Sequence, residues 1–291
     1  MAIATPRIMM EGLAFGESLR WHDGRLWASD WGTGQVLTLD SRGSARVVCT
    51  VESSPLCFDF LGDGQLVVAD SGGSKLCRLG LDGGLVEHAF LGGEGAPPWN
   101  EVVADTRRAK VYVNNIGFEF PAGEPKPGFV AVAANDGSVR RAAEDLAFPN
   151  GMIITPDGAS LIVAESWAGH LSAFDLAPNG DLSNRRVWAD LGEGAPDGIC
   201  MDAEGAIWYG DVPNQECVRV LEGGKVTDRV AFDRGCFSCV LGEAEGPALF
   251  VAATRWTGPG ELNSVATGQI LTVPVAIPAP SGQMPEPASG A

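Results

Sequence analysis

Six copies of one short pattern recur along the chain and constrain its fold more than any other feature. In each copy a small-residue turn precedes four or five apolar or β-branched residues, and in most copies a polar residue ends the run. The copies are GRLWASD (24–30), GQLVVAD (64–70), AKVYVNN (109–115), ASLIVAE (159–165), GAIWYGD (205–211) and PALFVAA (247–253). They begin 40 to 50 residues apart, a spacing that is typical of one blade of a β-propeller. We therefore predict an all-β fold, a six-bladed β-propeller with four-stranded antiparallel blades around a central tunnel.

A second apolar run follows each copy and predicts the next strand of the blade. Four of these runs come after a short turn, and they are QVLTLD (35–40), KLCRLG (75–80), HLSAFD (170–175) and CVRVLE (217–222). In the third and sixth blades the run comes later, near 129–132 and 270–273, which makes the loops 116–128 and 254–268 longer. Long loops in compact domains often carry function, so we expect them to form rims or lids over one face.

The composition favours one soluble globular domain. The chain has 291 residues, of which 45% are hydrophobic and 20% charged, and the even repeat argues against a division into two domains. Its 39 glycines and 19 prolines favour many turns over long helices. We predict a single propeller domain over residues 1–280. The Pro/Ser/Gly-rich tail, 281–291, is predicted to be disordered.

The charge and the cysteines restrict the partners and the compartment. A net charge of −17 repels phosphate backbones and disfavours nucleic acid as a partner. We find no signal peptide and no apolar run of roughly 18 residues, so we expect a cytoplasmic protein without membrane contact. Seven cysteines are scattered through strand-like segments, and we interpret them, including the lone CxxC of Cys236 and Cys239, as reduced core residues. We expect a small-molecule substrate and a monomer or weak homo-oligomer.

The blade period also selects a set of polar residues. The innermost strand of each blade should begin nine to eleven residues before the third position of each repeat, at Glu17, Cys57, Asn100, Asn150, Asp197 and Ser238. Because inner strands run along the propeller axis, these positions converge at one mouth of the tunnel. Two carboxylates and two amides at that mouth predict a site for a hard cation such as Ca²⁺ or Mg²⁺, and the lack of His and Cys ligands argues against a dedicated zinc site. The alternative is that Asn150-Gly151 and Asp197-Gly198 are ordinary turn dipeptides.

Several segments carry a family resemblance. They are FGESLRW (15–21), PNGMIITPDGASLIVAES (149–166), PDGICMDAEGAIW (196–208) and, more weakly, PWNEVVAD (98–105). In these segments the chain resembles the regucalcin/gluconolactonase (senescence marker protein-like) family of six-bladed propellers, and the resemblance runs from about residue 13 to 275.

The resemblance implies one divalent metal ion in the tunnel. Its ligands would be Glu17, Asn150 and Asp197, and Asn100 would help to bind metal or substrate. Ca²⁺ is our first choice, with Mg²⁺, Mn²⁺, Zn²⁺ and Fe²⁺ as alternatives.

The chain departs from the family pattern around this set. Ser18-Leu19 replaces Gly-Pro, Glu101 replaces Asp, and Asn114-Asn115 stands where Gly-Thr is common. We assign substrate contacts to Asn100, Trp99, Glu101 and Asn115. An arginine of sugar lactonases is not in its usual place, so Trp99, Phe118 and Trp256 either line a more apolar pocket or are ordinary packing residues.

These observations predict a metal-dependent hydrolase of a lactone or related ester, with Asp197 and Glu17 as catalytic residues. The metal would polarise the carbonyl, and Asp197 would also orient or deprotonate the attacking water. One alternative is phosphotriester or fluorophosphate hydrolysis on the same centre. Others are a non-catalytic calcium-binding propeller and a pure interaction scaffold. Serine hydrolysis is disfavoured because the three histidines lie in turns or at strand starts and no G-x-S-x-G motif accompanies them.

Overall fold

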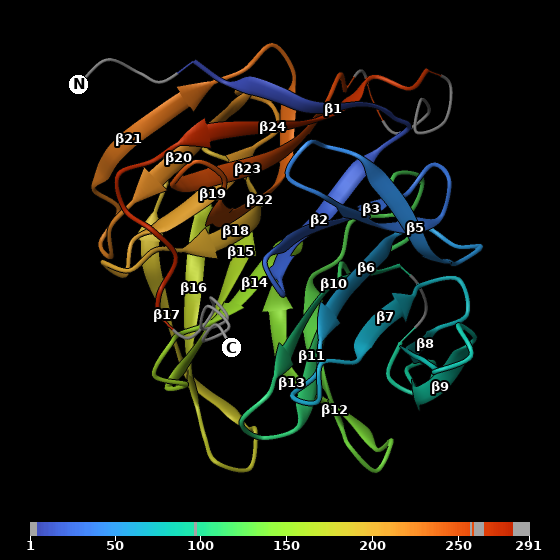
Figure 1. The fold of residues 1–291 in the computed structure, drawn as a ribbon. Helices are drawn as coiled ribbons and strands as arrows, with labels where there is room; N and C mark the ends of the chain where they lie inside the picture. The colour runs from blue at the N-terminus through green and yellow to red at the C-terminus, as the bar shows by residue number, and fades with distance from the viewer. Residues whose placement is uncertain (1–4, 96–97, 257, 259–264, 282–291) are drawn as a thin grey trace.

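The protein is a ring of six sheets. The computed structural model describes residues 5–95, 98–256, 258 and 265–281. These residues form six sheets of four strands, and the strands within each sheet run antiparallel. Figure 1 shows the sheets arranged around one axis. The predicted six-bladed β-propeller is therefore confirmed.

The first three blades follow the chain in order. Blade one contains β2 (Gly16–His22), β3 (Arg25–Asp30), β4 (Gln35–Leu39) and β5 (Ala45–Thr50). Blade two contains β6 (Leu56–Phe60), β7 (Leu66–Asp70), β8 (Lys75–Leu79) and β9 (Leu85–Phe90). Blade three contains β10 (Trp99–Asp105), β11 (Lys110–Asn115), β12 (Gly128–Ala134) and β13 (Val139–Leu146).

The other three blades complete the ring. Blade four contains β14 (Pro149–Ile154), β15 (Ser160–Glu165), β16 (His170–Leu176) and β17 (Leu182–Asp190). Blade five contains β18 (Pro196–Met201), β19 (Ile207–Asp211), β20 (Glu216–Val220) and β21 (Val226–Ala231). Blade six contains β22 (Gly235–Glu243), β23 (Pro247–Thr254), β24 (Gly268–Pro274) and β1 (Arg7–Leu13). The six repeats form the second strand of each blade, as predicted.

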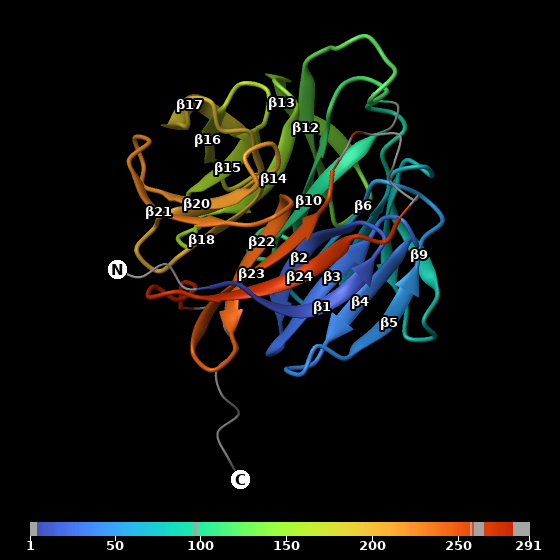
Figure 2. The same ribbon diagram turned by 90° about the horizontal axis from the view of Figure 1, so that it is seen from above.

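The N-terminal strand joins blade six, an arrangement that the repeat pattern does not predict. β1 pairs antiparallel with β24 and becomes the outermost strand of that blade. Figures 1 and 2 both show β1, at the blue end of the chain, beside the red β24. The amide of Gln269 also donates a hydrogen bond of 2.6 Å to Glu11 across the pair. An N-terminal strand thus closes the ring and covers a sheet edge that would otherwise be unpaired.

The polar residues that end most of the repeats are part of the scaffold. In blade one Asp30 accepts hydrogen bonds from the backbone N–H groups of Ala14 (3.1 Å) and Phe15 (2.8 Å), which lie in the segment that enters β2. In blade five the equivalent Asp211 accepts a bond of 3.4 Å from the N–H of Ala195. Because buried N–H groups need a partner, these carboxylates hold the entries to β2 and β18 in place.

The apolar core lies between the blades. Each cluster combines strands from two neighbours, as where Val67 of blade two packs with Val113 and Phe129 of blade three. All seven cysteines are buried and free, as predicted. After β24 the chain packs on blade five, where the carbonyl of Pro278 accepts a bond of 2.9 Å from the N–H of Ala203. The predicted disorder of 281–291 falls, apart from Ser281, outside the described residues.

No stretch of the described chain forms a helix with the length and hydrophobicity that a bilayer span requires.

Replacing Asp30 with alanine should destabilise the propeller. The change leaves buried N–H groups at the start of blade one without a charged acceptor, and we expect the free energy of unfolding to fall by about 3 kcal/mol. Urea denaturation followed by fluorescence measures this. The matched control is Asp63→Ala, because Asp63 is exposed and accepts one turn bond, and it should cost less than about 1 kcal/mol. Equal losses in the two variants would contradict the scaffold role.

Candidate functional site

Four polar residues at the starts of inner strands form the candidate site, which we call the axial set: Glu17, Asn100, Asn150 and Asp197. Each is the second residue of its strand, namely β2, β10, β14 and β18. In each of these blades the first residue of the inner strand pairs with the polar residue that ends the second strand. All four therefore lie at the same edge of their blades. Every inner strand packs against the inner strands of the two adjoining blades, so that edge surrounds one mouth of the ring.

Local irregularities occur in the strands that carry the axial set. The pairing register shifts between Glu17 and Arg20 in blade one and between Trp99 and Val102 in blade three. Blades four and five show the same shift after Pro149 and Pro196. In blade two, where Cys57 takes the equivalent position, the register is regular, whereas blade six has a shift between Cys236 and Ser238. Bulges redirect side chains, and they are frequent beside functional sites.

The glycines of Asn150-Gly151 and Asp197-Gly198 lie inside strands and are not turn residues. A Cβ atom on Gly151 would lie 2.5 Å from the carbonyl oxygen of Asp197, and one on Gly198 would lie 2.7 Å from the Cα of Ser238. Both distances are too short for a real contact, so glycine lets neighbouring inner strands approach each other. The turn alternative for these dipeptides is therefore wrong.

A network of amides fixes two members of the axial set. The Nδ2 of Asn100 donates to the Oδ1 of Asn150 (3.1 Å) and to the carbonyl of Pro149 (3.3 Å). Asn114, which is fully buried, donates to the backbone carbonyl of Asn150 (2.6 Å) and accepts a bond from the N–H of Glu101 (3.0 Å). The Nδ2 of Asn150 in turn contacts the hydroxyl of Ser166 at 3.4 Å. Blades three and four are thus joined at the site through hydrogen-bonded side chains.

The carboxylates of the site are buried close together. Glu17 is 4% exposed and Asp197 is 9% exposed. Burial raises the pKa of Glu17 well above its usual value, and the negative charges of Asp197 and Glu101 add to the effect. Burial also raises the pKa of Asp197, again with a contribution from Glu101. Like charges held at low exposure in one place favour the binding of a cation.

Arg20 forms an ion pair with Glu101, the third carboxylate near the site. Its guanidinium donates a bond of 3.0 Å to Oε1 of Glu101 and one of 2.7 Å to the carbonyl of Val102, and lies 3.4 Å from Asp59. Burial raises the pKa of Glu101, and the charge of Arg20 opposes that rise. Glu101 is therefore paired with a cation. Among the described residues, neither Glu17 nor Asp197 forms a salt bridge.

The donor chemistry of the axial set fits one hard cation. Two carboxylates and two amide oxygens are ligands that Ca²⁺ and Mg²⁺ prefer, with water completing the coordination. Asn150 Oδ1 keeps a second lone pair beside its bond to Asn100. Within the described ranges no three His, Cys, Asp or Glu side chains are grouped to hold a metal. A metal here would therefore depend on the amides as well as on Glu17 and Asp197.

Comparison with known proteins gives the family. The family described as "SMP-30/Gluconolactonase/LRE-like region" matches residues 15–255. The chain belongs to this family. The match includes all four members of the axial set and confirms the predicted resemblance.

Individual proteins are similar to this chain over part or nearly all of its length. An L-arabinolactonase of Azospirillum brasilense is 31% identical over 130 residues, which is 44% of this chain and 43% of that protein. The chain thus matches less than half the length of this curated relative. A solved luciferin-regenerating enzyme shares the fold with a TM-score of 0.78 at 18% identity, covering 94% of this chain and 97% of that one.

Two further solved structures have the same fold. The calcium-binding protein regucalcin of Agrobacterium tumefaciens has a TM-score of 0.73 at 18% identity, and the match covers 95% of each chain. The gluconolactonase XC5397 of Xanthomonas campestris has a TM-score of 0.71 at 20% identity, covering 94% of this chain and 97% of that one. At these identities the likeness concerns the fold alone.

The four residues that we assigned to substrate binding lie in different environments. Trp99 is fully buried and packs edge-to-face on Phe129 in the core between blades two and three. Its ring is a packing residue, and we do not assign it a substrate contact. Glu101 is held by Arg20, and Asn115 is buried and accepts a bond from the N–H of Gly117 (2.8 Å). Only Asn100 of the four belongs directly to the axial set.

Asn114, Arg20 and Ser166 support the site but were not predicted from the sequence. Asn114 was noted only as a departure from the family pattern, yet a buried amide at the end of an apolar strand is itself a signal of a polar network. No local signal identified Arg20, because its partners Glu101 and Asp59 lie in other blades.

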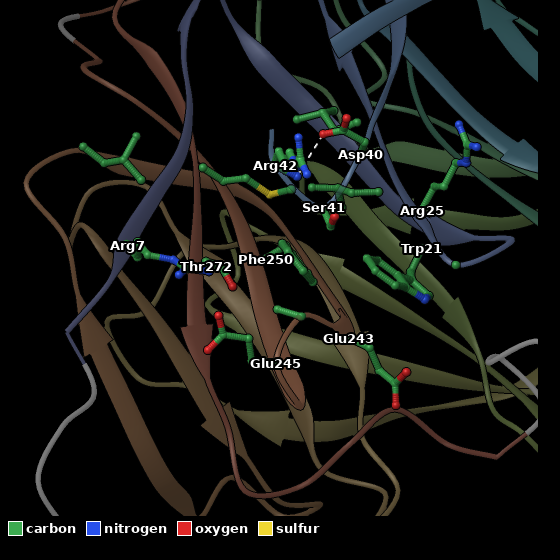
Figure 3. A pocket seen from close by; sticks show the side chains of 16 residues that line it. Arg7, Trp21, Arg25, Asp40, Ser41, Arg42, Glu243, Glu245, Phe250 and Thr272 are labelled. Carbon is green, nitrogen blue, oxygen red and sulfur yellow. Dashed lines mark hydrogen bonds between the residues drawn. The ribbon is translucent and has the colours of Figure 1, made fainter. Parts of the chain in front are cut away.

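Two cavities lie on the face opposite the axial set, where the hairpin turns after the inner strands gather. The larger has a volume of about 620 Å³ and includes Arg20, Asp59 and Cys239 in its lining. The smaller, of about 470 Å³, lies at the seam between blades six and one. Figure 3 shows Trp21 and Phe250 in this seam cavity, where the two rings stack with centroids 5.3 Å apart.

Glu165 positions the segment that carries Asn150. It is 1% exposed, and its carboxylate accepts bonds from Ser172 (2.5 Å), from Arg185 (2.7 Å) and from the N–H of Ala147 (2.7 Å). Burial alone would raise the pKa of Glu165, but these bonds lower it below its usual value. Because the pKa is lowered on folding, the stabilisation is present above the unfolded pKa and is lost as the pH falls through the folded one.

Glu165→Gln should therefore destabilise the protein in a pH-dependent way. We expect a loss of about 2 kcal/mol in the free energy of unfolding at pH 7. The difference from wild type should shrink as the pH falls below about 4.3, the ordinary pKa of Glu. Denaturant titrations between pH 3 and 8 measure both effects. The control is Glu144→Gln, since the side chain of Glu144 is largely exposed and pairs with Arg141, and it should change stability by less than about 1 kcal/mol. A loss that does not vary with pH would count against the assignment.

Proposed function

We propose that this protein hydrolyses a lactone or related ester and needs one divalent cation, with Ca²⁺ as the first choice, held by Glu17, Asn150 and Asp197. The observation that carries the proposal is the pair of buried, mutually repelling carboxylates beside two hydrogen-bonded amides at one mouth of the ring. Membership of a family that includes gluconolactonases supports the reaction class. The similarity to an L-arabinolactonase supports it further.

The residues of the axial set divide the work of hydrolysis. When bound, the cation would polarise the carbonyl and stabilise the negative charge that develops on its oxygen. Asp197 orients a water molecule and takes its proton as the water oxygen attacks the carbonyl carbon. The ring C–O bond then breaks, and the leaving oxygen receives that proton. Asn100 orients the substrate, and Glu17 and Asn150 hold the cation.

The burial of the site supports this chemistry. Charges interact more strongly where water is excluded, so preorganised groups stabilise a developing charge with little rearrangement. Asn114 and Ser166 fix the amide of Asn150, and the ion pair with Arg20 keeps Glu101 from competing for the cation.

Removing the cation or Asp197 should abolish the activity. We expect lactone hydrolysis to disappear in EDTA and to return when Ca²⁺, Mg²⁺, Mn²⁺, Zn²⁺ or Fe²⁺ is added. Asp197→Asn should lower kcat by about 10²- to 10⁴-fold, with an unfolding transition like that of wild type. Asp228→Asn is the matched control because the side chain of Asp228 is 57% exposed on an outer strand, and its kcat should stay within about two-fold.

The same assays distinguish the alternative functions. Full lactone hydrolysis by Asp197→Asn, or in EDTA, would remove the catalytic assignment. Turnover of phosphotriesters or fluorophosphates without turnover of lactones would favour the other hydrolase. Tight calcium binding in calorimetry without turnover of either class would favour a non-catalytic calcium-binding protein.

A further inference from the structure

Aromatic side chains border the candidate site on one side. Phe118, Phe120, Phe148 and Trp167 form a four-ring group that we call the rim cluster. The rings of Phe148 and Trp167 stack with centroids 4.8 Å apart, and Phe118 lies 5.3 Å from Trp167. Phe120 lies 5.1 Å from Phe148. Phe118 and Phe120 belong to the long loop between β11 and β12, so this predicted rim loop does contribute to the mouth.

The rim cluster lies beside the most accessible member of the axial set. Asn150 is half-buried, whereas Glu17, Asn100 and Asp197 are buried. Phe148 precedes Asn150 by two residues, and Trp167 follows Ser166, which contacts the side chain of Asn150. A molecule that reaches the carboxylates past Asn150 therefore passes these rings.

Two rings of the rim cluster face solvent. Trp167 is 54% exposed and Phe120 is 39% exposed. Phe148 also has a backbone φ of 58°, in the left-handed region that bulky residues rarely adopt. Bonds from Ser166 N–H to the Phe148 carbonyl (3.1 Å) and from Ala147 N–H to Glu165 hold it there. Backbone strain of this kind is concentrated at ligand-binding sites.

A second aromatic group lies across the mouth. Phe15, Trp31, Phe237 and Trp256 come from blades one and six, which are opposite blades four and three in a ring of six. Phe15 lies 4.6 Å from Phe237 and 5.3 Å from Trp31. Phe15 precedes Glu17 by two residues, so this group borders the other side of the axial set.

Two polar side chains beside the rim cluster, those of Asn114 and Ser166, are already bonded to the protein. Asn114 uses both ends of its amide, and the hydroxyl of Ser166 donates to the carbonyl of Pro196 (2.7 Å). A polyhydroxylated ligand would have to displace these bonds, whereas an aromatic ring requires only apolar contact area.

We propose, resting on the hydrolase function above, that the substrate is a lactone or ester carrying an aromatic ring, which binds against Phe120 and Trp167 while its carbonyl reaches the axial set. Aromatic surfaces on two sides of a carbonyl-activating centre favour an aryl group over a sugar ring. Phe120 and Trp167 are thus specificity residues, which contact the substrate away from the reacting carbonyl.

The kinetic test compares dihydrocoumarin, an aryl lactone, with glucono-1,5-lactone. We expect wild type to have the higher kcat/KM for dihydrocoumarin. Phe120→Ala and Trp167→Ala should lower that value about ten-fold or more, through KM, with about a two-fold change or less for gluconolactone. Trp167→Phe should retain most of the preference. Phe90→Ala, the matched control, removes a ring that is 58% exposed on an outer strand of blade two, and both substrates should be unaffected.

Two outcomes of the kinetic test would overturn the inference while leaving the hydrolase function intact. One is a higher kcat/KM for gluconolactone, and the other is an equal loss for both substrates in the rim variants.

Binding without turnover separates the inference from the proposed function. Chroman and 1,5-anhydroglucitol are the same two ring systems without the carbonyl, and calorimetry measures their affinities. Tighter binding of chroman, weakened in Phe120→Ala and unchanged in Phe90→Ala, supports the aromatic site even if no lactone is hydrolysed. Absence of chroman binding together with binding of 1,5-anhydroglucitol would overturn it.

Discussion

The close approach of six inner strands around one axis is the constraint on which the rest of this structure depends. Gly151 and Gly198 sit where a Cβ atom would collide with the backbone of the next blade. Neighbouring inner strands can therefore lie against one another, and their first residues surround a common mouth. The pairing of β1 with β24 maintains this arrangement, because it joins the two ends of the chain within one blade. A propeller without that pairing would expose the edge of β24.

The same closeness creates the electrostatic character of the site. Glu17 and Asp197 are about 180 positions apart in the chain. Burial raises the pKa of both, and the negative charges of neighbouring carboxylates add to the rise. Burying like charges opposes folding unless a cation or a proton compensates them. Hydrogen bonds around the site fix the segments that lead into the inner strands. Asp30, Glu165 and Asp211 anchor the entry segments, and Asn114 joins blade three to blade four. The polar residues at the ends of the repeats thus add anchoring bonds to the apolar packing between the blades, while the axial set keeps its buried charges.

The residues of the mouth form two kinds of surface. The axial set supplies oxygen ligands suited to a hard cation, and the rings of the rim cluster supply apolar area beside Asn150. Trp99 shows that a residue next to the axial set in the sequence need not belong to the mouth. It adjoins Asn100, but its ring is in the core and packs on Phe129. Alternation along β10 puts neighbouring side chains on opposite faces, so an axial residue and a core residue follow each other directly.

The sequence predicted the blades well because the information for each blade is local. A strand pattern and its turn lie within one repeat, and the period then places Glu17, Asn100, Asn150 and Asp197 in equivalent positions. The register shifts beside these residues were not foreseen, because a bulge depends on how two strands pair rather than on one strand's composition. The role of the Asn-Gly and Asp-Gly pairs was also open, since the same dipeptides serve turns and tight strand contacts.

What the sequence by itself determined is the number of blades, the repeat that forms the second strand of each blade and the positions that face the axis. The repeat period and the hydrophobic alternation are local properties of the sequence and do not depend on contacts between distant residues. Only the tertiary structure decided that β1 closes blade six, that Arg20 neutralises Glu101, and that the aromatic rings of four blades gather on two sides of one mouth. Each of these depends on contacts between residues that are far apart in sequence, and the packing of the blades around the axis brings them together.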